Sequence, residues 1–350
     1  MAHKLNIIAL EILEGCNLFC EFCVRNAINN LTNKVSIENY KKVVSNLKHF
    51  EETPNIALTG GEPFLQNDLL EFCKINDANK IGFSITTNAT IKNRKVIDFC
   101  ADSDYFRHFI ISIDSFKPEK HDSIRGNKAF ERSMKFIEYI KEKNIPFGIN
   151  MTVSEDNYLD VYDTILFAKN IGARDISVAT VKPNGRGEAT FTLDKLKIIA
   201  EQIIKNKHLI SDNFKVWATE VTFFLYDFDE YKNDIERGDT GSCQFADSTL
   251  HLRANGDILG CTACEDKVLG NLFEKTESDY LEKIWEHSPI LNSVRSKEDL
   301  KGECGSCEFL EFCGGCRCRA NGVHNDLFAE DPYCPIVLDP NFKESLNSSV

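Results

Sequence analysis

Strand-like and helix-like segments alternate along the first 200 residues, and this alternation constrains the fold more than any other feature. Short apolar segments rich in β-branched residues predict six strands, at residues 5–12, 55–61, 80–88, 106–114, 146–153 and 175–181. Amphipathic segments predict helices at 36–50, 69–78, 94–101, 129–144, 158–171 and from Leu193 onward. Parallel neighbours need a crossover, so six such units in series predict an α/β fold with a parallel sheet covered by helices. Periodicity leaves open whether the sheet curls into a partial barrel or is doubly wound.

The character of the chain changes after residue 210. Residues 211–242 are acidic and irregular and predict a bridge between two domains, 1–210 and 243–350. Beyond the bridge, Asn255-Gly256 predicts a hairpin turn, and a helix is expected at Tyr280–His287. The remaining segment is rich in Cys and Gly and too irregular to build its own core. Metal ligation is expected to substitute for that core in a small α+β domain.

Fourteen cysteines point to metal or redox chemistry, because disulfides do not persist in a reducing compartment. We expect that compartment to be the cytoplasm, since the N-terminus does not resemble a signal peptide and no apolar run is long enough to span a membrane. The net charge of −13 argues against a nucleic-acid partner. Three cysteines lie near the N-terminus and nine after residue 240, while Cys73 and Cys100 lie on predicted helices and are expected to be core thiols.

The N-terminal cysteines Cys16, Cys20 and Cys23 follow the first predicted strand. Three thiolates at this spacing can bind three corners of a cubane iron–sulfur cluster and leave one iron without a protein ligand. An open coordination position is typical of a reactive metal site, whereas structural zinc normally has four protein ligands. The alternatives are a structural zinc site or unrelated core thiols.

The CxxxCxxC spacing, with an aromatic residue before the third cysteine, resembles the radical S-adenosylmethionine (SAM) superfamily. The resemblance implies a partial (β/α)6 barrel in which SAM chelates the fourth iron of a [4Fe-4S] cluster. One electron then splits SAM into methionine and a 5′-deoxyadenosyl radical, which abstracts hydrogen from a substrate. Oxygen sensitivity is expected for such a cluster.

Further segments match the family in order. Gly60-Gly61-Glu62-Pro63 resembles the segment that binds the amino group of SAM, and small residues there allow a close backbone approach. Arg125 resembles an arginine that pairs with the SAM carboxylate. The resemblance also implies cosubstrate contacts for Phe22, Asn88, Ser112, Asp114 and Asn150. For these residues, capping, turn or core roles are the alternative.

The C-terminal cysteines resemble the SPASM extension of radical SAM enzymes, which holds two auxiliary iron–sulfur clusters, expected here as [4Fe-4S]. The segment Gly314-Gly315-Cys316-Arg317-Cys318 is similar to the maturase of pyrroloquinoline quinone biosynthesis. That similarity implies a first auxiliary cluster on Cys243, Cys261, Cys316 and Cys318, and a second on Cys304, Cys307, Cys313 and Cys334. Cys264 is then unassigned. The alternative is that these cysteines bind zinc, as in a ribbon-like fold, since thiolates are ligands of zinc as well as of iron–sulfur clusters.

The resemblance implies an enzyme that modifies a peptide or protein by oxidation or crosslinking. A separate leader-recognition protein would be needed if the substrate carries a leader, because the first predicted strand begins near residue 5. An electron donor such as flavodoxin or ferredoxin is also implied. The alternatives are a tetrapyrrole-modifying enzyme of heme biosynthesis and a non-catalytic iron–sulfur redox protein.

The sequence identifies no general base with certainty. A base would take up the proton that is released during radical oxidation. Glu265 and Asp266, just after Cys264, are candidates by position. A solvated turn is the alternative for both.

Overall fold

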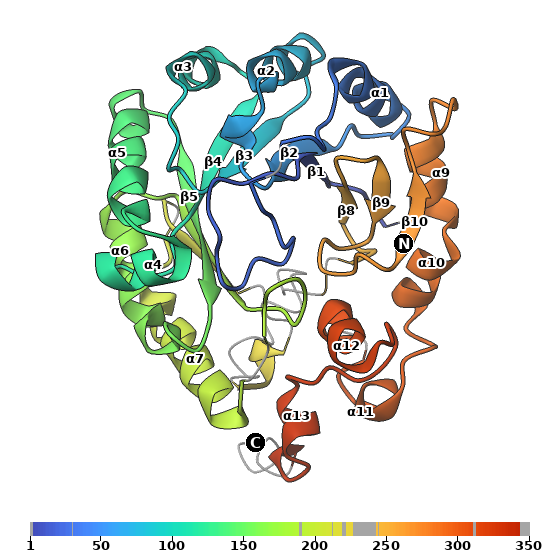
Figure 1. Ribbon diagram of the computed structural model, residues 1–350. Coiled ribbons are helices and arrows are strands. Elements are labelled where there is room, and N and C mark those ends of the chain that lie inside the picture. The colour runs from blue at the N-terminus through green and yellow to red at the C-terminus, as the bar shows by residue number, and fades with distance from the viewer. Residues whose placement is uncertain are drawn as a thin grey trace.

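The computed structural model describes residues 3–29, 31–188, 191–211, 213–218, 222–226, 243, 245–310 and 313–343. One ten-stranded sheet organises the chain, in the order β10-β9-β8-β1-β2-β3-β4-β5-β6-β7 (Figure 1). Its strands are β1 (Ile7–Leu13), β2 (Asn55–Gly60), β3 (Phe83–Thr87), β4 (Phe106–Ser112), β5 (Phe147–Val153), β6 (Asp175–Thr180), β7 (Lys215–Ala218), β8 (Thr249–Leu252), β9 (Asp257–Leu259) and β10 (Val268–Asn271). Strands β1 to β7 are parallel, and β8 pairs with β1 in the same direction. Strands β9 and β10 are antiparallel. The curved sheet therefore has two ends, β7 and β10, within the described ranges.

Most of the helices cover the outer face of this sheet, while the last three in the chain lie apart from that layer, toward the lower right of Figure 1. The helices are α1 (Ile37–Leu47), α2 (Leu69–Ala78), α3 (Arg94–Asp102), α4 (Pro118–Arg125), α5 (Ala129–Glu142), α6 (Val161–Asn170), α7 (Leu193–Lys205), α9 (Tyr280–His287), α10 (Pro289–Ser296), α11 (Gly302–Gly305), α12 (Arg317–His324) and α13 (Pro335–Leu338). Four short 3₁₀ helices are η1 (Pro63–Leu65), η2 (Tyr158–Asp160), η3 (Lys207–Leu209) and η4 (Phe223–Tyr226).

The main core lies between the sheet and the surrounding helices. On β1 the side chains of Ile8, Leu10 and Ile12 are fully buried and alternate with residues on the opposite face, as a strand requires. Edge-to-face contacts of Phe136 with Phe64 and Phe109 join the end of β2, strand β4 and helix α5. This packing fixes the ends of the strands, where the candidate site lies.

The six predicted strands and the partial barrel are confirmed, as is the hairpin at Asn255-Gly256, where Gly256 has a φ of 95°. The sequence interpretation of 211–242 as irregular is wrong at 215–218. Strand β7 lies there and pairs with β6, and a four-residue strand flanked by charged residues leaves too short a pattern to recognise. Residues 227–242 of that segment lie outside the described part of the chain. Helices α4 and α10 were not predicted, and both begin with proline at the first turn.

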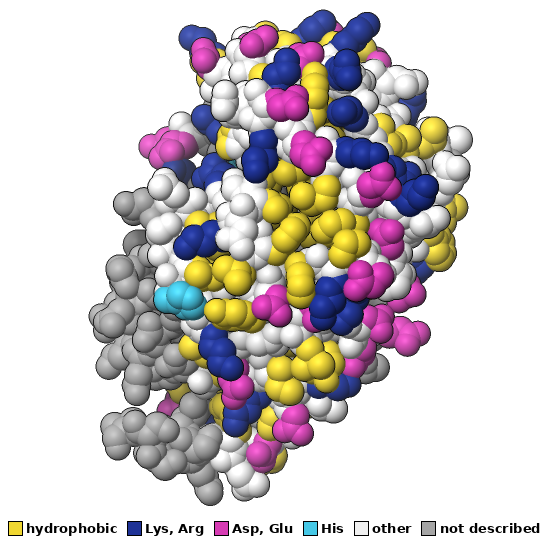
Figure 2. Space-filling view, turned by 90° about the vertical axis from the view of Figure 1, so that its left-hand side faces the viewer, with side chains coloured by type: hydrophobic (Ala, Val, Ile, Leu, Met, Phe, Trp, Pro, Cys, Tyr) yellow, Lys and Arg dark blue, Asp and Glu magenta, His cyan; other side chains and the backbone are white. Residues whose placement is uncertain are grey.

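Figure 2 shows the barrel face on the side of α4 to α7, which lies at the left of Figure 1. Lysine and arginine side chains lie among aspartate and glutamate side chains there, around a group of apolar side chains, rather than in one basic patch. Within the described residues, no helix combines the length and apolar character needed to cross a membrane.

Candidate active site and cluster sites

The three N-terminal thiols lie on the loop that follows β1. Cys16 is buried, Cys20 and Cys23 are half-buried, and all three pack with Leu18 and Ala27. Backbone N–H groups of Leu18 and Ala27 donate to the Sγ atoms of Cys16 and Cys23, each at 3.4 Å. Burial raises the pKa of Cys16 to about 11. Since a coordinated thiol is deprotonated outright, this donor set fits a positively charged metal centre.

The loop is held from the far side of the barrel by Arg186. Its Nε donates to the Cys20 carbonyl at 2.9 Å, and its backbone N–H donates to the Cys23 carbonyl at 3.0 Å. The guanidinium also lies 3.9 Å from the ring centre of Phe19. The segment after β6 therefore fixes the thiol loop. Sequence reasoning missed this residue because 163 positions of chain separate Arg186 from Cys23.

Gly60 and Gly61 lie directly against the start of the thiol loop. A Cβ atom at Gly61 would be 2.0 Å from the Gly15 carbonyl oxygen, so only glycine fits. The Glu62 carboxylate is fully buried and accepts from the Thr87 hydroxyl and the backbone N–H groups of Phe64 and Asn88. Burial raises the pKa of Glu62 to about 7. The side chain of Glu62 thus joins the ends of β2 and β3, while Pro63 begins η1.

Asp114 and Arg125 form a buried pair at the end of β4. The Arg125 Nη2 donates to Asp114 Oδ1 at 3.1 Å, and its Nε donates to Oδ2. Thr152 N–H on β5 donates to the same carboxylate at 3.0 Å. The guanidinium lies 5.7 Å from the ring centre of Phe22, which stands between Cys20 and Cys23 in the sequence. The structure therefore places Arg125 at the thiol loop and makes Asp114 the residue that holds it.

Of the remaining predicted cosubstrate residues, Asn88 follows β3, Ser112 ends β4 and Asn150 lies within β5. Asn88 Nδ2 donates to Cys16 Sγ at 3.7 Å and to Asn17 Oδ1 at 3.1 Å. Ser112 and Asn150 are register partners on β4 and β5. Asn88 and Ser112 thus lie at the carboxyl ends of their strands, where α/β proteins bind ligands, and Asn150 lies beside Ser112 on the next strand.

Five thiols gather in the first C-terminal group. The Sγ atoms of Cys264 and Cys318 are 2.7 Å apart, and both side chains are buried. Burial raises the pKa of Cys243 to about 12, and the neighbouring thiols of Cys316 and Cys261 add to this shift. Cys264, unassigned from the sequence, lies inside this group rather than apart from it.

The second C-terminal group is built around one apolar cavity. Cys304, Cys307, Cys313 and Cys334 line it together with aromatic and aliphatic side chains such as Phe224, Phe309 and Ile336. Among the described residues, no three histidine, cysteine or carboxylate side chains converge as ligands of a single metal ion. An iron–sulfur cluster spreads its thiolates over separate irons, so four thiols around one cavity fit such a cluster.

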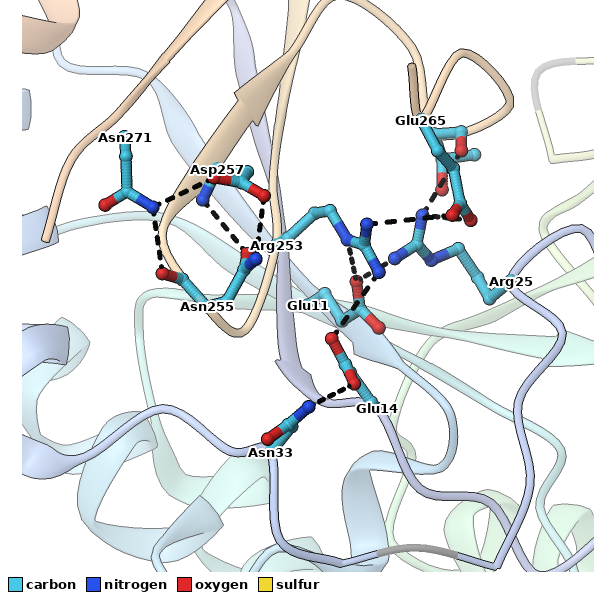
Figure 3. Close-up of polar contacts among 10 residues, drawn as sticks. Glu11, Glu14, Arg25, Asn33, Arg253, Asn255, Asp257, Glu265 and Asn271 are labelled. Carbon is cyan, nitrogen blue, oxygen red and sulfur yellow. Dashed lines mark hydrogen bonds and ion pairs between the residues drawn. The ribbon is translucent and has the colours of Figure 1, made fainter. Parts of the chain in front are cut away.

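A network of charged side chains joins the thiol loop to the C-terminal region (Figure 3). Arg25, two residues after Cys23, donates to Glu11 on β1 at 2.7 Å and to Glu265 at 2.9 Å. Arg253, just after β8, lies 3.9 Å from Glu11, 3.4 Å from Glu14 and 3.6 Å from Glu265. Burial raises the pKa of Glu11 despite these arginines. The network was not visible in the sequence, because 240 positions separate Arg25 from Glu265.

The two weak catalytic candidates are both ion-paired. Glu265 is bound by the two arginines of this network, and Asp266 lies 2.7 Å from Lys267 and 2.8 Å from Asn321. Although burial opposes it, hydrogen bonds from Lys267 and Asn321 lower the pKa of Asp266. These contacts favour structural roles. His251 on β8, two residues before Arg253, is a further titratable residue that sequence reasoning missed, and burial lowers its pKa to about 4.

Comparison with known proteins agrees with this geometry. Residues 10–168 match the model of the radical SAM superfamily, and residues 243–308 match the SPASM iron–sulfur cluster-binding domain. The chain is a radical SAM enzyme with a SPASM domain. The radical SAM domain binds a [4Fe-4S] cluster and SAM, and the SPASM domain binds auxiliary iron–sulfur clusters.

Similar proteins cover nearly the whole of this radical SAM enzyme. It is 27% identical to an AdoMet-dependent heme synthase of Methanosarcina barkeri, over 95% of this chain and 97% of the relative. It is 24% identical to a PqqA peptide cyclase of Bradyrhizobium diazoefficiens, over 94% and 86%. Streptococcus suis SuiB, solved with its precursor peptide SuiA, superposes with a TM-score of 0.76 at 20% identity, covering 95% of this chain and 76% of that one. The last comparison supports the fold.

Proposed function

We propose that this enzyme modifies a peptide or protein substrate, by oxidation or by crosslink formation. The observation that carries the proposal is the pair of C-terminal thiol groups, linked through Gly314-Gly315-Cys316-Arg317-Cys318, behind a radical SAM site. Relatives that match over more than nine-tenths of this chain include a PqqA peptide cyclase, a subtilosin biosynthesis protein and a mycofactocin maturase. Auxiliary clusters suit net oxidation, because they can accept the electron left on a product radical.

We assign the site residues as follows. Cys16, Cys20 and Cys23 hold three irons of the radical cluster, which with SAM supplies a 5′-deoxyadenosyl radical when both are bound. The backbone at Gly60 and Gly61 allows close approach of the SAM amino group. Asp114 occupies the Nε–Nη2 edge of Arg125, so that the guanidinium is oriented to bind the SAM carboxylate. Asn88 orients the Cys16 thiolate, and Phe22, Ser112 and Asn150 complete the cosubstrate pocket.

The assignment of the two auxiliary groups follows their grouping in space. Cys304, Cys307, Cys313 and Cys334 hold one cluster in their shared cavity. Four of the five thiols Cys243, Cys261, Cys264, Cys316 and Cys318 hold the other. A flavodoxin or ferredoxin would supply electrons in the cytoplasm, and a separate protein would recognise any leader of the substrate.

The experiment is an anaerobic assay of reconstituted enzyme with dithionite, SAM and deuterium-labelled candidate peptides. We expect deuterium in 5′-deoxyadenosine and a mass change in the peptide. The variant Cys16→Ala/Cys20→Ala/Cys23→Ala is the control and should give neither. Deoxyadenosine without deuterium for every peptide would contradict the peptide assignment while leaving the radical chemistry intact.

A tetrapyrrole is the second candidate substrate, favoured by one observation. The heme synthase relative matches over 97% of its own length at 27% identity, compared with 86% and 24% for the peptide cyclase. Absorbance titration of the enzyme with a porphyrin separates the two candidates. A saturable spectral shift, with mass loss from the porphyrin in the complete assay, would favour the tetrapyrrole and overturn the peptide proposal.

A further inference from the structure

Two arginines near the start of α12 are almost completely buried. Arg317 and Arg319 alternate with the thiols of Cys316 and Cys318, and their exposed fractions are 2% and 0%. Removing a charged side chain from water costs several kcal/mol unless opposite charge and hydrogen bonds compensate it. Each guanidinium therefore needs a negatively charged partner in the folded protein.

The partner of Arg319 is Asp331, which is itself fully buried. The Arg319 Nε and Nη2 donate to the two oxygens of the Asp331 carboxylate at 2.9 and 2.6 Å. The same carboxylate accepts from the backbone N–H of Cys316 at 2.7 Å. The charge of Arg319 is thus compensated within the protein.

Arg317 has no such carboxylate among the described residues. Its Nη1 donates to the carbonyls of Leu327 and Ala329 at 3.0 and 2.7 Å, and its buried Nε has no partner. Its Nη2 approaches the Sγ atom of Cys304 at 3.8 Å. In the part of the chain that the structure describes, the nearest group able to carry negative charge is therefore a thiol that lines the second auxiliary cavity.

Glycine at 315 makes this approach possible. Gly315 has a φ of 64°, and a Cβ atom there would lie 2.7 Å from Arg317 Nη2 and 3.3 Å from Cys304 Sγ. Asp331 adds a second donor on the same sulfur, since its backbone N–H lies 3.4 Å from Cys304 Sγ. Two N–H groups from separate segments thus converge on one thiol.

We propose that Arg317 is the counter-charge of the second auxiliary cluster and raises its reduction potential. Reduction adds one negative charge to a cluster. A buried guanidinium beside a ligand sulfur stabilises the reduced form more than the oxidised form. Asp331 contacts a thiol residue of each auxiliary group. Its carboxylate accepts from the backbone N–H of Cys316, and its own backbone N–H donates to Cys304 Sγ. The proposal rests on Cys304 as a cluster ligand and is independent of the substrate.

The test is a redox titration of the auxiliary clusters followed by electron paramagnetic resonance. The variant Cys16→Ala/Cys20→Ala/Cys23→Ala serves as background, so that only auxiliary signals remain, and iron is measured in parallel. Arg317→Gln and Arg317→Lys are compared with Arg295→Gln. Arg295 is a matched control because it lies in the same C-terminal region and donates to the carbonyls of Ala246 and Trp285.

We expect Arg317→Gln to keep about eight irons, as two [4Fe-4S] clusters require, and to lower one of the two auxiliary potentials. The reduction equilibrium of that cluster should fall at least tenfold, which is 59 mV for one electron. Arg317→Lys should show a smaller decrease, because it keeps the charge without the fork of N–H donors. Arg295→Gln should leave both potentials unchanged.

Three outcomes would overturn the proposal. The first is an Arg317→Gln protein with both potentials equal to those of the control. The second is an equal shift in the reduction potentials of both clusters, which would show a long-range electrostatic effect rather than a contact with one cluster. The third is loss of cluster from both Arg317 variants, which would make the residue structural. If only Arg317→Gln loses iron, the reduction potential of Arg317→Lys decides the question. A potential below that of the background protein supports the proposal, and an equal potential overturns it.

Discussion

The barrel and the C-terminal segment differ in how their thiols relate to the apolar core. Cys16, Cys20 and Cys23 lie on a loop beside a large core that contains none of them. In the second auxiliary group, Cys334 is itself part of a small apolar cluster, and Cys307 and Cys313 pack against it. Helices α11 and α13, which flank these thiols, have four residues each. The thiols of the barrel therefore lie beside its core, whereas those of the second auxiliary group form part of the small apolar cluster around them.

Removal of all iron is expected to give the largest effect on local stability. The comparison between the two regions fails if both respond in the same way. Metal binding supplies folding free energy where the apolar core is small, so residues 304–310 and 334–338 should lose hydrogen-exchange protection in the cluster-free protein. Strands β1 to β6 should keep theirs. The measurement is anaerobic hydrogen exchange with mass spectrometry before and after chelation. Equal loss in both regions would show that the barrel also depends on its cluster.

The buried pairs Arg319–Asp331 and Arg125–Asp114 allow a matched comparison. Asp331→Ala and Asp114→Ala each leave a buried guanidinium uncompensated and should each cost about 3–5 kcal/mol of unfolding free energy. Their iron contents should differ. Asp331→Ala should lose auxiliary iron, because its carboxylate also holds the Cys316 backbone, while Asp114→Ala should keep it.

The control for these variants is Asp279→Ala, which breaks an exposed pair with Lys283 and should cost far less unfolding free energy, because solvent screens an exposed pair. Anaerobic urea unfolding and iron analysis provide the measurements. Retention of all auxiliary iron by Asp331→Ala would contradict the difference between the regions.

The third prediction concerns the pH dependence of the barrel. Burial lowers the pKa of His121 to about 4, and its Nδ1 accepts from the Asp114 backbone N–H. Between pH 6.5 and pH 4 the unfolded chain binds a proton that the folded chain does not, so stability falls as pH falls. From pH 7 to pH 5 this residue should cost about 2 kcal/mol.

His121→Asn keeps an acceptor for that N–H and should flatten the profile by this amount. Urea unfolding at pH 7 and pH 5 measures the effect. An unchanged slope in the variant would assign the acid sensitivity to other groups.

The smallest effect is expected at the start of α1. Ser36 Oγ accepts from Asn39 N–H at 3.1 Å, so Ser36→Ala should cost about 1 kcal/mol. Because this cap is remote from the thiols, the loss should be the same with and without clusters. The same unfolding experiment on both forms sharpens the comparison, and a loss confined to one form would contradict it.

Much of the fold could be predicted from the sequence because its signals are local. The alternation of β1 and the start of α1 after Ser36 depend on residues within a few positions of one another. The predicted helices at 69–78 and 280–287 coincide with α2 and α9. Strand β7 escaped prediction because it has four residues and is stabilised by pairing with β6.

The cysteine spacings by themselves indicated metal chemistry, because thiols spaced as Cys16, Cys20 and Cys23 can share one metal centre, and the family resemblance added the radical reaction. Only the tertiary structure decided the roles of the charged residues. Asp114 was predicted to contact SAM, and the structure pairs its carboxylate with Arg125; Glu265 was a candidate base, and the structure pairs it with Arg25. The burial of Arg317 beside Cys304 is equally absent from the sequence pattern. The reason is physical: the partner of a charged side chain is set by burial and by segments brought together across the chain, and neither leaves a local periodicity to read.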